Sequence, residues 1–248
     1  MPHDHAIQCI HDPLLVALSY LVCVLGSFTA LQLAIAIPAA RGAAQRWRAI
    51  FGAGAAMGGG AIWAMHFIAM LACRMDLPVS YDLGITALSA AIAIASCMAG
   101  LAIASAGVFG WGKLVLAGLF MGVGVTGMHY TGMAAMLMPA TIDYDTTLVA
   151  ASAAIAIVAS IVALWLAFNL RGWLQMLGSA LVMGVAVCGM HYTGMLAARF
   201  LPSGSNALPV GLSGNNLGMG IFAVTTLLLA VVLSTSLIRQ RQREMVQI

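Results

Sequence analysis

Charged residues are scarce in this chain of 248 residues, where Asp, Glu, Lys and Arg together make up 7% of the sequence. Soluble domains are about 25% charged. Hydrophobic residues account for 62%, and no water-soluble fold of this size can bury so much apolar surface. The composition therefore predicts an integral membrane protein. The net charge is only +3, and no basic patch or glycine-rich phosphate loop indicates a nucleic-acid partner.

Carboxylates and paired cysteines are scarce as well. The only glutamate is Glu244 in the polar tail, so the sequence holds no catalytic constellation and we do not expect an enzyme. The five cysteines form no CxxC pair and no even disulfide framework. Cys23 and Cys97 lie inside apolar runs and are expected to be buried small residues. The amino end lacks the basic start and apolar stretch of a cleavable signal peptide.

Long apolar segments are what the sequence does contain. Seven of them are long enough to cross a hydrocarbon core of about 30 Å as helices. Backbone groups cannot stay unpaired in lipid, and no alternating pattern of transmembrane strands occurs. The sequence thus predicts an all-α membrane protein with seven transmembrane helices, at residues 13–37, 49–73, 83–107, 114–138, 148–170, 176–200 and 217–238.

Basic residues give the expected orientation. Eight of the ten lie in alternate loops and in the tail, which should be cytoplasmic, whereas Arg74 and Arg199 lie with all six aspartates on the other side. We therefore expect residues 1–12 to be a periplasmic segment, residues 13–238 to be the membrane domain and residues 239–248 to be a basic cytoplasmic tail. The protein is expected in the bacterial inner membrane, with its amino terminus in the periplasm.

An internal repeat occurs three times along the chain. The second, fourth and sixth segments contain Met65-His66-Phe67-Ile68-Ala69-Met70, Met128-His129-Tyr130-Thr131-Gly132-Met133 and Met190-His191-Tyr192-Thr193-Gly194-Met195. The segments before them begin after Asp12, Asp82 and Asp145, each followed seven residues later by a serine. Three helix pairs and one extra seventh helix follow from this pattern. The aspartates are interpreted first as helix N-caps.

The histidines of this repeat are the main candidates for a site. His66 and His191 each lie eight residues before an interfacial arginine, or about 12 Å along a helix, in the outer half of the membrane. A polar ring at that depth needs a partner. Each histidine shares a helix face with the methionine four residues on. The predicted ligands are His66, Met70, His129, Met133, His191 and Met195.

Imidazole and thioether together favour copper, particularly Cu(I), over zinc, and haem is not expected. A histidine, tyrosine and aspartate network without metal is the alternative. The leading methionines, the motif tyrosines, the repeated aspartates and one further histidine form a second tier of candidates: Met65, Met128, Met190, Tyr130, Tyr192, Asp12, Asp82, Asp145 and His11. An amino-terminal cluster of His3, His5, Cys9 and His11, and a ligand role for Cys188, are weaker hypotheses.

The chain resembles the MHYT family of bacterial integral-membrane sensor domains. Copies two and three carry the Met-His-Tyr-Thr motif, whereas Phe67 and Ile68 replace Tyr and Thr in copy one. The resemblance implies a seven-helix sensor that binds copper near the periplasmic face and senses a diatomic gas such as oxygen, carbon monoxide or nitric oxide. Relatives often carry cyclic-di-GMP or kinase domains. Only ten residues follow Ile238, so we expect a free-standing module or one separated from its output domain.

The functional hypothesis is accordingly a copper-dependent membrane sensor, with the lipid bilayer, a gas ligand, a cytoplasmic signalling protein and a second copy of the chain as partners. A transporter or channel for copper or a small solute is the alternative, although the inner halves of the helices offer few polar residues for a path. A membrane oxidase is a third hypothesis, which the absence of carboxylates within the membrane segments disfavours.

Overall fold

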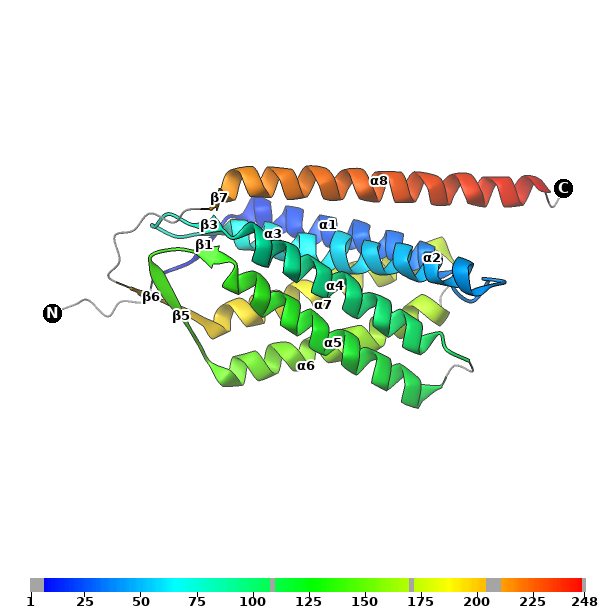
Figure 1. Ribbon diagram of the computed structural model, residues 1–248, viewed down its shortest axis with the longest axis horizontal. Coiled ribbons are helices and arrows are strands. Elements are labelled where there is room, and N and C mark those ends of the chain that lie inside the picture. Colours follow the sequence, from blue (N-terminus) through cyan, green and yellow to red (C-terminus); the bar gives the residue numbers. More distant parts are fainter. Residues whose placement is uncertain (1–6, 108–109, 170–171, 204–210, 247–248) are drawn as a thin grey trace.

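The computed structural model describes residues 7–107, 110–169, 172–203 and 211–246. Its helices lie side by side along one axis, and short strands gather at one end of the bundle (Figure 1). The described amino end lies at this strand end, and the last helix terminates at the opposite end (Figure 1). His3 and His5 of the amino-terminal cluster fall outside the described residues.

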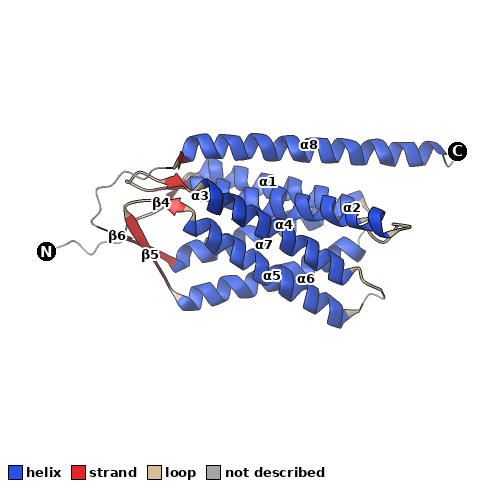
Figure 2. Cartoon of the chain, viewed as in Figure 1, coloured by secondary structure: helices blue, strands red, loops and turns tan. Residues whose placement is uncertain are grey.

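Seven helices are long and apolar enough to cross a membrane, which confirms the predicted number. The second is continuous from Ala43 to Ala72 but includes a π-helical stretch, η1. The other spans are α-helices, and Figure 2 shows helices as the main part of the bundle with the strands at one end. The helical elements are α1 (Pro13–Ala34), α2 (Ala43–Gly54), η1 (Ala55–Trp63), α3 (Ala64–Ala72), α4 (Leu83–Ala104), α5 (Trp111–Ala134), α6 (Thr146–Asn169), α7 (Trp173–Ala197) and α8 (Gly214–Val246).

Short strands connect the helices at the strand end, and the sequence did not predict them. They form two antiparallel pairs, β1–β2 and β5–β6, and a three-stranded sheet in the order β4-β3-β7. Because these strands lie outside the spans, they leave the all-α membrane core unchanged. Their bounds are β1 (Ile10–His11), β2 (Cys73–Arg74), β3 (Ser80–Tyr81), β4 (Met136–Leu137), β5 (Ala140–Tyr144), β6 (Ala198–Pro202) and β7 (Leu212–Ser213).

The repeated aspartates cap the three odd-numbered spans, as predicted. The Asp12 carboxylate accepts hydrogen bonds from the Leu14 and Leu15 amides, and the Asp82 carboxylate accepts one from the Ile85 amide. Asp145 caps α6 in the same way through the amides at residues 147 and 148. Each cap satisfies amide groups that the first helical turn leaves without a partner.

Six of the spans form a closed ring. Helix α4 packs on α5, α5 on α6, α6 on α7 and α7 on α1. The α2–η1–α3 span closes the ring by packing on both α1 and α4. Helix α8 lies outside the ring against α1, η1 and α3 (Figure 1). The pairing into three helix pairs plus one extra helix therefore matches the packing.

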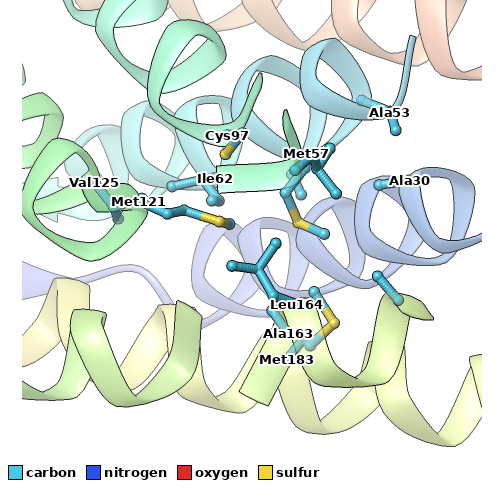
Figure 3. Packing of buried hydrophobic residues seen from close by; sticks show 14 of the residues in the cluster. Ala30, Ala53, Met57, Ile62, Cys97, Met121, Val125, Ala163, Leu164 and Met183 are labelled. Carbon is cyan, nitrogen blue, oxygen red and sulfur yellow. The ribbon is translucent and has the colours of Figure 1, made fainter. Parts of the chain in front are cut away.

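Small residues let the ring close tightly. A Cβ on Gly58 would overlap the backbone of Ala93 in α4, and one on Gly122 would overlap Ile157 in α6. A Cβ on Gly184 would press on Val24 and Tyr20 in α1. Such contacts are the usual way for membrane helices to approach one another closely. Small and branched apolar side chains fill the interior, as Figure 3 shows for Ala30, Ala53 and Leu164.

Candidate metal centre

Three buried histidines meet inside the ring near the strand end. His66 on α3, His129 on α5 and His191 on α7 are each 0% exposed. The Nδ1 atom of His66 lies 3.0 Å from Nδ1 of His191 and 3.2 Å from Nδ1 of His129. One ligand atom from each ring lies within 4.8 Å of the others. Three equivalent helices thus present three imidazole nitrogens to a single point, as the repeat predicted.

This spacing suits a metal ion. Two nitrogens that each lie about 2.0–2.1 Å from a tetrahedral metal are about 3.3 Å apart, close to the two Nδ1 separations of 3.0 Å and 3.2 Å. The Nε2 atoms of the three rings are buried and have no hydrogen-bond partner among the described residues. Among the described residues, the printed polar contacts of the three rings are therefore the Nδ1 contacts with one another, and these Nδ1 atoms are the ones placed to bind a ligand.

Glycines of the same motif hold two of the imidazoles in place. A Cβ on Gly132 would overlap the Nε2 edge of His66, and a Cβ on Gly194 would overlap the Nε2 edge of His129. Each of these histidines thus packs on the backbone of the next copy. The corresponding position of copy one holds Ala69. The sequence names these glycines only as letters of the motif, and it did not predict this direct contact.

The motif tyrosine of copy two, and a tryptophan in copy one, anchor the helices that carry His129 and His66. The Tyr130 hydroxyl lies 2.9 Å from Oγ of Ser152, the repeated serine of α6. In copy one, which has Phe67, the indole N–H of Trp63 donates to Oγ of Ser89 at 3.0 Å. Tryptophan thus replaces the missing hydroxyl there, a substitution that the aligned motif letters conceal because Trp63 lies four residues earlier.

The motif methionines are all buried but belong to two different clusters. Met70, Met133 and Met195 pack at the strand-end side with Phe67, Ile68 and other apolar residues. Met65, Met128 and Met190 pack into the main core of the ring. The first set follows each histidine by four residues, and the second set precedes it by one. The ligand role of Met70, Met133 and Met195 stays a prediction.

The aspartates bind elsewhere. Besides capping α1, Asp12 forms an ion pair with Arg74. The amides of Leu15 and Leu14 and the Arg74 guanidinium hold the pKa of Asp12 below its usual value. The hydrogen bonds described for Asp12, Asp82 and Asp145 go to helix amides or to Arg74 and not to an imidazole, which argues against the metal-free histidine and aspartate network.

A short strand covers the site at the strand end. His11 packs edge-on against Tyr192 with ring centroids 5.4 Å apart, and Tyr192 in turn packs against His191 at 5.0 Å. Burial lowers the pKa of His11. A disulfide between Cys9 and Cys73 fixes this strand to the end of α3. The expectation of no disulfide framework is thus corrected, because the partners lie 64 residues apart and only the fold brings them together.

Cys23 and Cys97 are buried, as expected, and Cys188 is a free, partly buried thiol. Cys188 does not belong to the histidine group that could hold a metal. Within the described part of the chain, that group consists of His66, His129 and His191.

Comparison with known proteins identifies this three-fold arrangement. The MHYT family model, described as the bacterial signalling protein N terminal repeat, matches residues 59–117, 122–180 and 184–246. The chain belongs to the MHYT family. The family repeat starts in the helix that carries each histidine, so it pairs α7 with α8 and leaves α1 outside. The packed ring instead includes α1 and excludes α8.

Relatives of the chain are signalling proteins. It is 41% identical over 239 residues to the bifunctional diguanylate cyclase/cyclic di-GMP phosphodiesterase MucR of Pseudomonas aeruginosa, covering 93% of this chain and 34% of the relative. It is 36% identical to the cyclic di-GMP phosphodiesterase NbdA of the same organism, covering 86% and 28%. The signaling protein YkoW of Bacillus subtilis is 31% identical, with 78% and 25% covered.

The chain spans about a third or less of the length of these curated relatives. No solved structure matches it. The family and the seven apolar helices make this chain a multi-pass membrane sensor domain of the MHYT type.

Proposed function

We propose that this domain is a copper-dependent sensor whose ion is held by His66, His129 and His191. The convergence of three buried Nδ1 atoms carries the proposal. A neutral imidazole has one N–H and one lone pair. Without a cation, three such rings can at best direct two N–H donors at one lone pair, which leaves the group poorly satisfied. A cation at the centre accepts all three lone pairs.

Copper fits the donors better than zinc does. The thioethers of Met70, Met133 and Met195 lie one helical turn from the imidazoles on the same helices, and soft sulfur ligands select Cu(I). Bound copper would supply a centre that can change its oxidation state or take a diatomic gas. The surrounding apolar residues exclude water from the site.

The signal would pass through the helices that hold the histidines. Because α3, α5 and α7 each contribute one imidazole to one point, a change in the distances between these imidazoles shifts the three helices relative to one another. We propose that the domain lies in the inner membrane with its strand end facing the periplasm, and that the carboxyl end of α8 reaches a cytoplasmic signalling partner. The basic residues near the opposite end support this orientation.

Elemental analysis of the purified full chain tests this function. We expect copper in the wild type after mild detergent extraction and loss of most of it in His66→Ala, His129→Ala and His191→Ala. His11→Ala is the matched control, because its imidazole lies outside the group. Exposure of the loaded wild type to nitric oxide or carbon monoxide should change its visible or electron paramagnetic resonance spectrum. A wild type without transition metal, or triad variants with full metal content, would contradict the proposal.

A further inference from the structure

A second repeated feature lies deeper in the ring than the histidines. Each helix that carries a histidine also carries a Met-Gly pair nearer the opposite end: Met57-Gly58, Met121-Gly122 and Met183-Gly184. The methionine precedes the histidine by nine residues in copy one and by eight in the other copies. Eight residues of helix place it about 12 Å further into the membrane.

The π-helix explains the unequal spacing. Element η1 runs from Ala55 to Trp63, so it lies between Met57 and His66 and is the only π-helix in the described part of the chain. A π-bulge accommodates one extra residue within an α-helix. The extra residue of copy one is therefore absorbed between the two side chains, and Met57 keeps the position that Met121 and Met183 hold. The glycine after each methionine packs on a neighbouring span of the ring, which fixes the depth of all three.

The three methionines face one interior space. Met57, Met121 and Met183 are 6%, 3% and 4% exposed, and all three line a cavity of about 20 Å³. Figure 3 shows their sulfur-bearing ends turned into the space between the helices. A water molecule needs at least about 10–15 Å³ by this measure, so the cavity has room for one ion. Met190, next to His191, lines the same cavity.

A cysteine completes the set of sulfur ligands. Cys97 on α4 is 0% exposed and lines an adjoining cavity of about 10 Å³ together with Met57 and Met121. It lies fifteen residues after Asp82, and Ser160 lies fifteen residues after Asp145. Among the described residues, Ser160 is the one polar residue lining the larger cavity. We call Met57, Met121, Met183 and Cys97 the sulfur tier.

We propose that the sulfur tier is a second metal site, selective for a soft monovalent ion of the Cu(I) class. Thioether and thiolate ligands select Cu(I), whereas hard divalent ions require several oxygen ligands, and Ser160 provides a single side-chain oxygen at the larger cavity. The Cys97 thiol loses its proton to water as a metal–sulfur bond replaces the S–H bond, and no oxidation state changes. One thiolate then neutralises one positive charge, so the loaded site suits its apolar surroundings.

Packing alone is the competing explanation, because methionine is a common filler of apolar cores. Packing does not require the same depth in all three copies, nor a π-helix that preserves it, nor a cavity where the side chains meet. The site is independent of the histidine triad, since none of its four residues belongs to that group.

Silver binding provides the first test. Ag(I) is a soft monovalent ion that does not change oxidation state, and it is added as silver nitrate to the purified full chain in detergent. After gel filtration, Met57→Leu/Met121→Leu/Met183→Leu should retain one Ag(I) per chain less than the wild type. Leucine nearly conserves methionine volume, so the fold should persist. The control Met98→Leu/Met138→Leu/Met176→Leu removes three methionines that line neither cavity and should match the wild type. Equal silver content in the sulfur-tier variant and the wild type would overturn the site.

A triad-free background separates the two sites. His66→Gln/His129→Gln/His191→Gln should still retain one Ag(I), bound by sulfur alone in X-ray absorption, and should lose it when the three Met→Leu changes are added. A background that retains no silver overturns the sulfur tier. The copper proposal fails separately: in that case X-ray absorption of copper-loaded wild type would show no nitrogen ligands around the copper.

Proton release provides a test that needs no methionine variant. Binding of Ag(I) to the triad-free background should release one proton per ion, and Cys97→Ser in that background should abolish the release. Cys188→Ser is the matched control, since Cys188 is a free thiol that lines neither cavity. Silver binding without proton release, or release that Cys97→Ser leaves unchanged, would overturn the role of Cys97.

Discussion

Because Gly132 and Gly194 have no Cβ, the imidazoles of His66 and His129 can occupy their positions. Alanine at either position would place a methyl group on the Nε2 edge of the ring. The new methyl group would be fixed to a helix backbone, which cannot move far in a close-packed bundle. The ring must therefore leave the position that brings its Nδ1 atom to the point where the three Nδ1 atoms meet.

We predict that Gly132→Ala and Gly194→Ala weaken copper binding by about 10–100-fold, the usual effect of disturbing groups that orient metal ligands. The measurement is copper affinity by competition with a chelator of known affinity. Gly127→Ala and Gly189→Ala are matched controls on the same helices, because a Cβ there meets nothing within 4 Å. These controls should bind normally and gain up to about 1 kcal/mol of helix stability. Normal copper affinity in Gly132→Ala would contradict the contact.

The repeat allowed the polar residues of the site to be predicted, because histidine and aspartate are rare in membrane segments and recur at equal spacing. His66, His129 and His191 were expected at one depth and meet there. Contacts between copies could not be predicted, since a glycine in a membrane helix is common and its neighbour depends on helix rotation. Trp63 was missed for a related reason, because it replaces a tyrosine from a different position in the sequence.

At the scale of elements, apolar length predicted all seven spans, but it could not predict their interruptions. The π-helix arises from one extra residue between Met57 and His66 and leaves the hydropathy unchanged. The short strands were missed because pairs such as β1 and β2 have only two residues each, too few for an alternating pattern. Their partners are distant in sequence, as with Ile10 and Arg74.

The π-helix gives a prediction about chain length. Deletion of Gly59 reduces the offset from Met57 to His66 from nine residues to eight, as in the other copies, so an ordinary α-helix would keep both side chains in place. We predict that this deletion is tolerated, with copper and silver content near wild type. Deletion of Val123 in α5 should instead rotate Met121 by about 100° relative to His129 and cause loss of the silver bound at the sulfur tier. The measurements are gel filtration, thermal unfolding and metal content.

Opposite results would change the interpretation of η1. If deletion of Gly59 removes metal while deletion of Val123 does not, the π-helix has a role of its own. It would then do more than keep Met57 at the depth of Met121 and Met183. Gly59 is suited to this experiment because a Cβ there would make only ordinary van der Waals contact with Ile94.

At the scale of the whole molecule, the ring closes on itself and α8 packs on its outside. The ring closes through the contact of α1 with α7, and all three histidines and the sulfur tier lie on its helices. Helix α8 contacts the outside of the ring, where Leu229 packs over Gly60 in η1 and Gly218 packs against Leu71 in α3. Its neighbours thus include the span that carries Met57 and His66.

This arrangement predicts that a chain ending at Ser213 folds and keeps both proposed metal sites. None of the described side chains of α8 belongs to the histidine group or lines either cavity. The shortened chain should elute as a folded species with wild-type copper and silver content, although it unfolds at a lower temperature because the apolar contacts of α8 are lost. Leu229→Ala in the full chain is the milder comparison and should lower the unfolding temperature with metal content unchanged. Loss of copper on truncation would mean that α8 helps to build the site. Retention would make α8 a receiver, moved by the α2–η1–α3 span and connecting the proposed metal sites to the opposite end of the bundle.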